Sequence, residues 1–270
     1  MIRRAANLLA ILAAALVAGP SSKAVPQTAV RTVEVEGTAF RVTLADGRVL
    51  TQDELNGVQI VLGDGSGQRR RIRIDAVQRD AKDPAGEIVL YALSAQDPAS
   101  GEWRNLCEPD PEGRRLGFPL AGAFTPGGEH VALNGRLLIT CTGGAEGKCV
   151  RFGYKPWRQA KDGASLASYY QTCVRLVRAD YCGDGIGHTR NGTPIDLFDR
   201  IGIQPDEAAP GMTFEAAWGP DGAVCVRHTR LKEALNAAAL VQQCPRLAGS
   251  IGEKCDEATS ALLFNRSFER

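Results

Sequence analysis

Histidine and methionine are scarce in this 270-residue sequence, and neither charge sign is in clear excess. It contains three histidines and two methionines, and 32 basic against 31 acidic residues leave a formal net charge of +1. Nucleic-acid-binding proteins need a net basic face that displaces counterions from phosphates, so this balance argues against that class. The one basic cluster, Arg69 to Arg73, runs into alternating isoleucines and predicts a solvated sheet face. The Gly-x-Ser-x-Gly motif of serine hydrolases is also absent.

Long apolar runs are missing except at the N-terminus. Arg3 and Arg4 precede an apolar segment at 5–18, and small residues follow as far as Ala24. This order predicts a secretory signal peptide over residues 1–24, with cleavage after Ala24. The apolar segment is shorter than the roughly 20 residues that span a bilayer, so we expect no membrane span after cleavage. Cleavage removes three positive charges and no negative one, which lowers the formal net charge from +1 to −2. We expect an exported protein, periplasmic or secreted.

No cysteine precedes residue 107, but eight occur from there on. They are Cys107, Cys141, Cys149, Cys173, Cys182, Cys225, Cys244 and Cys255. An even number in an exported chain predicts up to four disulfides, for which 105 connectivities are possible. Cys141 and Cys149 enclose three glycines and have apolar residues on both sides, which favours a hairpin closed by a disulfide between them. Proximity alone suggests Cys173 with Cys182, and Cys244 with Cys255.

The first half of the sequence is typical of short strands joined by turns. Apolar and polar residues alternate over 32–36, 40–44 and 71–75, and residues 88–93 are the most apolar strand candidate, which we expect at the centre of a sheet. Short strands at regular spacing predict a β-rich N-terminal unit over residues 30–136, sandwich or barrel-like, that ends in a connector rich in proline and glycine.

Over residues 137–270, helix signals appear beside the cysteines. Ser165 precedes apolar residues that recur at helical spacing over 166–177, which predicts a helix with Cys173 facing inward. A second helix is expected over 229–243, capped by its first threonine, and a strand pair precedes it. The fold class expected is therefore α+β, in which the β-rich N-terminal unit is followed by a disulfide-stapled α+β domain.

Several short motifs follow one another in this second half. They are CTGGAEGKCV at 141–150, GYKPW at 153–157, RADYCGDG at 178–185, HT at 188–189 and GTPID at 192–196. Their combination resembles the bacterial ADYC-domain family, named for the four residues that stand here at 179–182. The resemblance covers roughly residues 137–245. It implies an exported, cysteine-rich protein of a family without an established activity, and so supports location and architecture without supplying a reaction.

The stretch from Arg178 to Arg200 concentrates aspartates and glycines around one cysteine and one histidine. A structural interpretation explains most of these residue types. The cysteine would pin the turn after the helix through a disulfide, the glycines would permit backbone angles that other residues resist, and the aspartates would cap turns. The residues concerned are Cys182, Gly183, Gly185, Gly187, Asp180, Asp184 and Asp196.

Two metal hypotheses compete with that interpretation. A hard cation such as calcium would be held by Asp180, Asp184, Asn191 and Asp196. Zinc would be held by Cys182, His188, Cys225 and His228. The first set fails the EF-hand pattern, and the second has no standard zinc spacing. We therefore expect no metal and no other cofactor.

Catalysis and carbohydrate binding are the remaining alternatives. Catalysis by Cys182 would need a free thiol, which an even cysteine count does not predict. A hydrolase stays open, in which His188 is the base and Asp184 or Asp196 its orienting partner. A carbohydrate platform would use Trp103, Trp157 and Trp218, although burial is the commoner fate of tryptophan. We favour a non-enzymatic function, that of a cell-envelope binding or interaction module with an unknown ligand.

Overall fold

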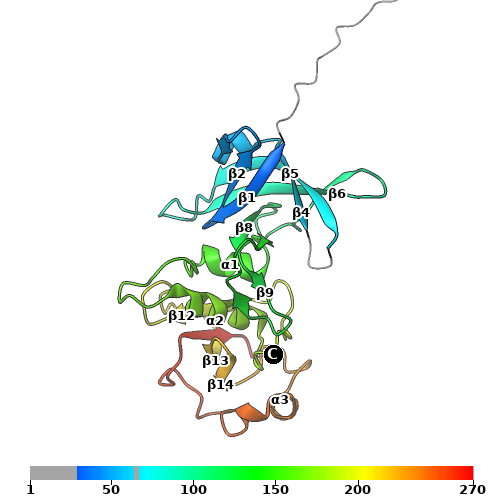
Figure 1. Cartoon of the computed structure of the whole chain (residues 1–270). Helices are drawn as coiled ribbons and strands as arrows, with labels where there is room; N and C mark the ends of the chain where they lie inside the picture. The colour runs from blue at the N-terminus through cyan, green and yellow to red at the C-terminus, as the bar shows by residue number, and fades with distance from the viewer. Residues whose placement is uncertain (1–28, 64–66, 270) are drawn as a thin grey trace, which may run out of the picture.

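The computed structural model describes residues 29–63 and 67–269. The predicted signal peptide, with its cleavage point after Ala24, lies outside the described residues. A β-rich unit occupies the upper part of the molecule in Figure 1, and a smaller sheet with helices occupies the lower part. The expected order, a β-rich unit followed by a disulfide-stapled α+β domain, is confirmed.

The upper unit consists of two antiparallel sheets. The smaller sheet, of order β1-β2-β3, contains β1 (Val30–Glu36), β2 (Ala39–Leu44) and β3 (Val49–Leu50). The larger sheet, of order β11-β8-β6-β5-β4 with β7 added to β6, contains β4 (Gln59–Gly63), β5 (Arg69–Arg79), β6 (Val89–Gln96), β7 (Trp103–Asn105), β8 (Gly117–Ala121) and β11 (Leu137–Cys141). A 3-10 helix η1 (Gln52–Leu55) completes the unit. The short ribbon of β9 (Ala123–Phe124) with β10 (His130–Val131) lies against helix α2 (Leu166–Arg178), where the His130 N–H donates to the Gln171 side chain at 2.8 Å (Figure 1).

Alternating apolar side chains hold the two upper sheets together. Phe40 and Val42 of β2 are buried, as are Ile72 and Ile74 of β5, while the residues between them are more exposed. Burial of each such side chain contributes about 1.5–3 kcal/mol. The Tyr91 hydroxyl of β6 accepts a hydrogen bond from the Phe40 N–H at 3.0 Å, which links the sheets directly. The apolar run that was expected at the centre is confirmed there as β6, between β5 and β8.

The lower unit is a four-stranded antiparallel sheet with helices packed against it. The sheet, of order β12-β15-β13-β14, contains β12 (Ile195–Asp199), β13 (Thr213–Gly219), β14 (Gly222–Val226) and β15 (Leu263–Ser267). The helices are α1 (Ala145–Arg151), α2 (Leu166–Arg178), α3 (Ala237–Gln243) and the 3-10 helix η2 (Pro245–Leu247). Helix α2 contacts β13, β14 and β15. Two predictions are confirmed, because the Ser165 side chain caps α2 and Cys173 is fully buried.

The second expected helix begins later than its sequence indicates. Helix α3 starts at Ala237, and the Asn236 side chain caps it by accepting a hydrogen bond from the Ala239 N–H at 2.9 Å. The expectation that Thr229 caps a helix from that point is wrong. Its hydroxyl donates to the Leu235 carbonyl instead, so the intervening residues close a compact turn.

All eight cysteines form disulfides, and each disulfide joins segments distant in sequence. The pairs are Cys107–Cys141, Cys149–Cys173, Cys182–Cys244 and Cys225–Cys255. The expected pair of Cys141 with Cys149 is wrong, because the residues between them begin helix α1 and not a hairpin. Cys149 therefore faces Cys173 of α2. The two pairs suggested by proximity, Cys173 with Cys182 and Cys244 with Cys255, are also wrong. Tertiary packing, and not distance in sequence, selects the partners.

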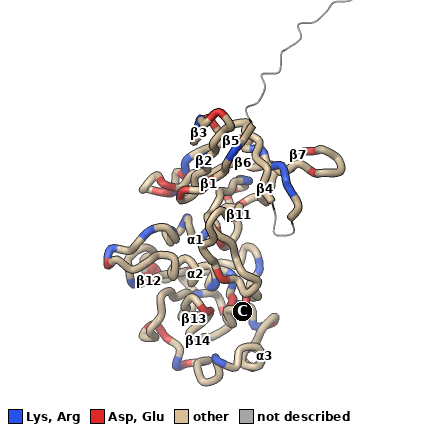
Figure 2. Tube along the Cα trace, in the orientation of Figure 1, with Lys and Arg blue, Asp and Glu red and all other residues tan. Residues whose placement is uncertain are grey.

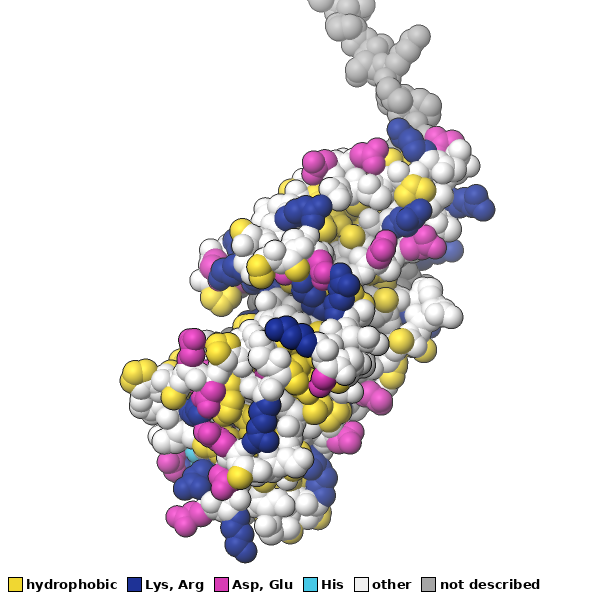
Figure 3. Space-filling view, turned by 90° about the vertical axis from the view of Figure 1, so that its left-hand side faces the viewer, with side chains coloured by type: hydrophobic (Ala, Val, Ile, Leu, Met, Phe, Trp, Pro, Cys, Tyr) yellow, Lys and Arg dark blue, Asp and Glu magenta, His cyan; other side chains and the backbone are white. Residues whose placement is uncertain are grey.

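Buried ion pairs connect the two units. Arg151 at the end of α1 donates to the Asp80 carboxylate after β5, at 2.5 Å. The Lys155 amino group lies 2.9 Å from Asp83 and 3.1 Å from Glu87. Figure 3 shows lysine and arginine side chains around the junction between the two lobes. Strand β11, which starts at residue 137, completes the upper sheet, so chain on both sides of the expected boundary contributes to the upper unit.

No helix among the described residues is both long enough and apolar enough to cross a membrane.

Candidate functional site

The ADYC residues begin with a left-handed turn that ends helix α2. After Arg178, Ala179 has φ 52° and ψ 42°, a conformation that costs a residue with a side chain about 1–2 kcal/mol. Two N–H groups of the turn donate hydrogen bonds to carbonyls in the last turn of the helix: Ala179 donates to Leu176 and Asp180 to Arg175. Ala179 is fully buried, so a larger residue would need space that the fold does not provide.

The Asp180 carboxylate closes the loop that follows. It accepts hydrogen bonds from the N–H groups of Gly183, Asp184 and Gly185 at 2.9–3.1 Å. It also forms an ion pair with the Arg175 guanidinium, and both side chains are buried. Every oxygen of Asp180 is thus engaged within the protein. This carboxylate organises the turn and has no lone pair directed to solvent for a cation.

Cys182 fastens the same loop to the C-terminal end of α3 through Cys244. Gly183 has a φ of +74°, and a Cβ atom there would overlap the Asp221 carbonyl, so only glycine fits. Gly185 also has a positive φ, whereas Gly187 does not. These contacts are those of a disulfide-pinned turn, as the structural interpretation expected for Asp180, Cys182, Gly183 and Gly185. Its expectation that Asp196 caps a turn is wrong, because Asp196 lies within strand β12.

Tyr181 connects the turn to a buried ion pair. Its hydroxyl donates to Glu215 at 2.9 Å and accepts the Arg230 N–H at 2.8 Å. The Arg230 guanidinium makes two hydrogen bonds of 3.0 Å to the Glu215 carboxylate. Burial raises the pKa of Glu215, but the charge and hydrogen bonds of Arg230 outweigh it, so the pKa is lowered overall. Arg230 also donates to the carbonyls of Leu176 and Val177 and thereby caps α2.

The structure does not bring the candidate catalytic residues together. The His188 ring stacks on Tyr181, with ring centroids 6.2 Å apart, and its buried Nε2 has no hydrogen-bond partner among the described residues. Asp184 is exposed and accepts the N–H of Ile186. Asp196 lies on β12 and forms an ion pair with Arg266 at 3.1 Å. No hydrogen bond within the described part of the chain joins His188 to either carboxylate, so the hydrolase hypothesis stays a prediction.

The zinc and thiol hypotheses are wrong, because Cys182 and Cys225 are in disulfides. Across residues 29–63 and 67–269, no three histidine, cysteine, aspartate or glutamate side chains are grouped to hold a metal ion. The platform of three tryptophans is wrong as well. Trp218 is fully buried and donates to the Asn265 side chain at 2.7 Å, so it presents no face to a sugar.

A pocket of about 510 Å³ borders the ADYC turn, and we call it the motif pocket. One wall is the beginning of α1 and the residues before it, Gly143–Lys148. Another is the end of α2, Val177–Arg178, and the third is the loop Gly187–Ile195. The buried ion pair supports these walls, because Arg230 bonds both the Val177 carbonyl and the Thr189 hydroxyl.

Three cations, Lys148, Arg178 and Arg190, line the motif pocket, and the Glu146 carboxylate of the first wall lies 4.0 Å from the Arg178 guanidinium. Lys148 and Arg190 form no ion pair or side-chain hydrogen bond within the described residues, and Arg178 donates to the Gly185 carbonyl at 2.6 Å. Apolar surface comes from Phe152 and other side chains beside these cations. The chemistry offered is therefore that of a site for an anion with an apolar portion. All three cations lie in or beside motifs that the sequence shows, but no spacing rule relates Lys148 to Arg178 and Arg190, so the sequence alone does not predict the pocket.

A family model described as the ADYC domain matches residues 52–232. No curated protein and no solved structure matches the chain significantly. The family match begins inside the β-rich unit and so reaches well before the motifs that carried the resemblance. It also includes all three walls of the motif pocket. Because the match covers more than half of the 270 residues, the chain belongs to the ADYC domain family.

Proposed function

We propose that this protein is an exported, non-enzymatic binding module of the cell envelope. Its ligand is a small organic anion that carries an apolar group, and the binding site is the motif pocket. The observation that carries the proposal is the lining of that pocket: Lys148 and Arg190, which form no ion pair within the described chain, lie beside Arg178 and apolar side chains.

Export agrees with the chemistry of the cysteines. Four disulfides persist in an oxidising compartment and are rare in a reducing cytosol. The proposed route is the signal peptide over residues 1–24, followed by cleavage after Ala24. The mature protein then acts in the periplasm or outside the cell.

The proposal of binding without turnover follows from how the signature residues are used. Asp180, Tyr181 and Cys182 are each engaged in an ion pair, a hydrogen-bond network or a disulfide of the fold. A general base needs a reachable proton and an orienting partner. His188 has no such partner within the described chain, and no free thiol supplies a nucleophile there.

The size and charge of the motif pocket define the ligand class. A volume of about 510 Å³ lies within the range of sites for small molecules, roughly 300–1,000 Å³. Lys148 is half-buried, so its attraction to an anion is screened less by salt than that of the exposed Arg190. A carboxylate or phosphate would meet these cations, and an apolar group would contact Phe152 and its neighbours.

Nuclear magnetic resonance titration of the mature chain tests the proposal. The probes are phenyl phosphate and benzoate, with benzyl alcohol as the neutral control of similar size. We expect the anions to shift backbone signals of residues 143–148 and 187–195, and the neutral probe to leave them nearly unchanged. Affinity for the anions should fall about ten-fold in the double variant Lys148→Gln with Arg190→Gln, the equivalent of about 1.4 kcal/mol.

Lys161→Gln is the matched control, because Lys161 is an exposed lysine that does not line the motif pocket. It should bind the anions as tightly as the unmodified chain. Equal shifts from neutral and anionic probes, no shifts at all, or equal weakening in Lys161→Gln would each contradict the proposed site.

A further inference from the structure

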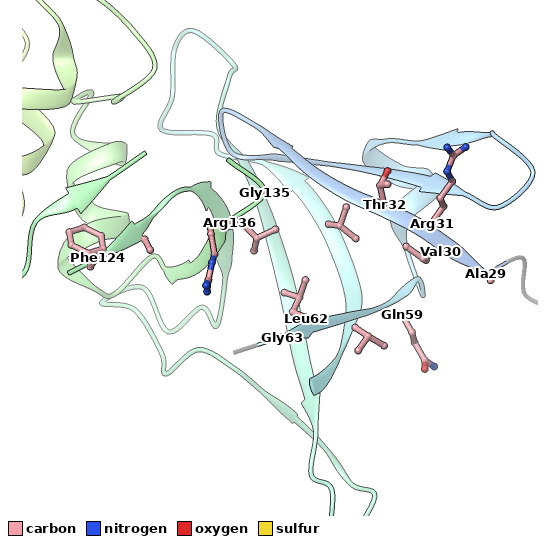
Figure 4. Close-up of a pocket in the computed structure, with 14 residues that line it drawn as sticks. Ala29, Val30, Arg31, Thr32, Gln59, Leu62, Gly63, Phe124, Gly135 and Arg136 are labelled. Carbon is pink, nitrogen blue, oxygen red and sulfur yellow. The ribbon is translucent and has the colours of Figure 1, made fainter. Parts of the chain in front are cut away.

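A second concave surface lies on the upper unit, where strand edges are left without a neighbour. It has a volume of about 840 Å³ and is bordered by β1, β4, β9 and the residues that lead into β11. Figure 4 shows β1 and β4 on two sides of this edge groove. Both are end strands of their sheets, since β1 pairs only with β2 and β4 only with β5 in the described chain. Each therefore has one edge free to accept another strand.

The register of β4 shows which backbone groups face the groove. The Ile74 N–H of β5 donates at 3.0 Å to the carbonyl of Val58, the residue just before β4. Hydrogen-bonded and non-bonded pairs alternate along an antiparallel ladder. Ile60 is two residues after Val58, so its backbone groups also form hydrogen bonds to β5. The N–H and C=O groups of Gln59 and Val61 therefore point away from β5, toward the open edge.

The register of β1 gives the corresponding result on the other side. The Phe40 N–H donates to the Tyr91 hydroxyl, so it points away from β1. Val35 lies opposite Phe40, which makes this a non-bonded pair. The backbone groups of Val35, and of Val33 two residues away, consequently point away from β2. Val33 and Val61 both line the groove and make no backbone hydrogen bond to a further element of the described chain.

The side chains around the edge groove are apolar and basic. Val61 is 56 % exposed, which is unusual for a large aliphatic residue, and Phe124 and Leu137 also line the groove. Arg31 and Arg136 are exposed at its border, and no aspartate or glutamate is among the described lining residues. The exposed arginines of β5 lie directly beside β4.

From these edges and charges we infer that the edge groove binds an extended, acidic segment of a partner polypeptide as an added β-strand. The free backbone groups at Val33 and Val61 supply the hydrogen bonds, and the apolar lining receives alternate side chains. Acidic side chains of the segment meet Arg31 and Arg136. A second copy of this chain fits less well, because it would bring the same arginines together.

A peptide titration of the mature chain tests this inference. The probe is a blocked heptapeptide that alternates glutamate with valine, and its control has lysine in place of glutamate. We expect the acidic peptide to bind and to slow hydrogen exchange of the Val33 and Val61 amides, and the lysine peptide to bind at least ten-fold more weakly. Charge reversal by Arg31→Glu with Arg136→Glu should invert that preference.

Val61→Pro removes a backbone donor that the β4–β5 ladder does not use, and proline is tolerated on an edge strand. This variant should lower the affinity for the acidic peptide at least ten-fold. Val61→Thr keeps the N–H group, and its affinity should stay within two-fold of that of the unmodified chain. Binding of phenyl phosphate to the motif pocket should stay the same in both variants.

Three results would overturn the inference. They are no binding of the acidic peptide, equal binding of both peptides, and a dimer in sedimentation velocity that Val61→Pro dissociates. The last result would assign the groove to a second copy. If Val61→Pro fails to fold, the charge-reversal variant decides the question alone, because its substitutions lie on exposed side chains.

Discussion

The two units of this protein are stabilised in different ways. In the upper unit, apolar side chains alternate along strands and form a core that continues into the lower unit, and its one disulfide, Cys107–Cys141, lies beside β7 and β11. The lower unit has three disulfides and two fully buried ion pairs, Arg175–Asp180 and Arg230–Glu215. Charged side chains are thus part of the interior of the lower unit, and Figure 2 marks the positions of charged residues along the chain trace.

This difference explains what the ADYC residues do. Ala179 adopts the left-handed conformation that turns the chain, and the Asp180 carboxylate accepts hydrogen bonds from N–H groups of the loop. The Tyr181 hydroxyl donates to Glu215, and Cys182 fixes the loop by its disulfide. All four residues position the loop that walls the motif pocket. The signature therefore supports a site that it does not itself contact.

The largest effect is expected from breaking the Arg230–Glu215 pair. Glu215→Ala leaves the Arg230 guanidinium and the Tyr181 hydroxyl without their buried partner, which should cost about 3–5 kcal/mol of unfolding free energy. Urea denaturation of the variant and the unmodified chain measures this difference in unfolding free energy. The matched change in the upper unit is Tyr91→Phe, which removes one hydrogen bond and should cost about 1 kcal/mol. Equal losses in the two variants would contradict the comparison.

Removing the Cys182–Cys244 disulfide should have the next largest effect. The two cysteines are 62 residues apart in sequence, and the double change to serine should cost about 2–4 kcal/mol. Hydrogen exchange should speed up in the loop at 179–195 and stay unchanged in β5 and β6. If β5 and β6 exchanged faster by the same factor, the two units would not differ in their dependence on disulfides.

Acid should weaken the contact between the units. Burial raises the pKa of Asp80, but the hydrogen bond and charge of Arg151 outweigh it and lower the pKa overall. The same balance, with Lys155 as partner, lowers the pKa of Asp83. Their contribution is therefore complete above the unfolded value, about pH 4, and is lost as pH falls through the lowered folded pKa. Asp80→Asn should show a smaller loss of stability between pH 5 and pH 2 than the unmodified chain in thermal denaturation.

The smallest effect is expected at His188. Replacement by alanine removes one ring stacked on Tyr181 and should cost about 1 kcal/mol or less. Binding of phenyl phosphate in the motif pocket should be unchanged. A hydrolytic activity that exists in the unmodified protein and disappears in His188→Ala would support the hydrolase hypothesis and contradict a purely structural role of His188.

Local signals in the sequence were sufficient wherever one segment determines its own structure. The Ser165 cap and the helical spacing after it predicted α2, and alternation predicted the strands around β5 and β6. The turn at Cys182 was also interpreted correctly, because glycine, aspartate and cysteine each have a local structural role there.

Long-range packing decided the features that the sequence did not predict. Cys149 turned away from Cys141 because α1 begins between them, and its partner lies on a helix 24 residues later. Thr229 does not cap a helix, and neighbouring Arg230 enters the core to meet Glu215. The motif pocket combines three separate segments, which no spacing rule joins. The domain division at residues 136–137 stays a prediction.

Disulfide mapping of the protein purified from the exported fraction is the most direct test of the central claim, that the ADYC turn is a disulfide-pinned scaffold. Its intact mass should be eight hydrogens below that of the reduced mature chain, because all eight cysteines are paired. Non-reducing digestion should yield a peptide that links Cys182 to Cys244. A free Cys182 thiol, or its pairing with a different cysteine, would contradict the account.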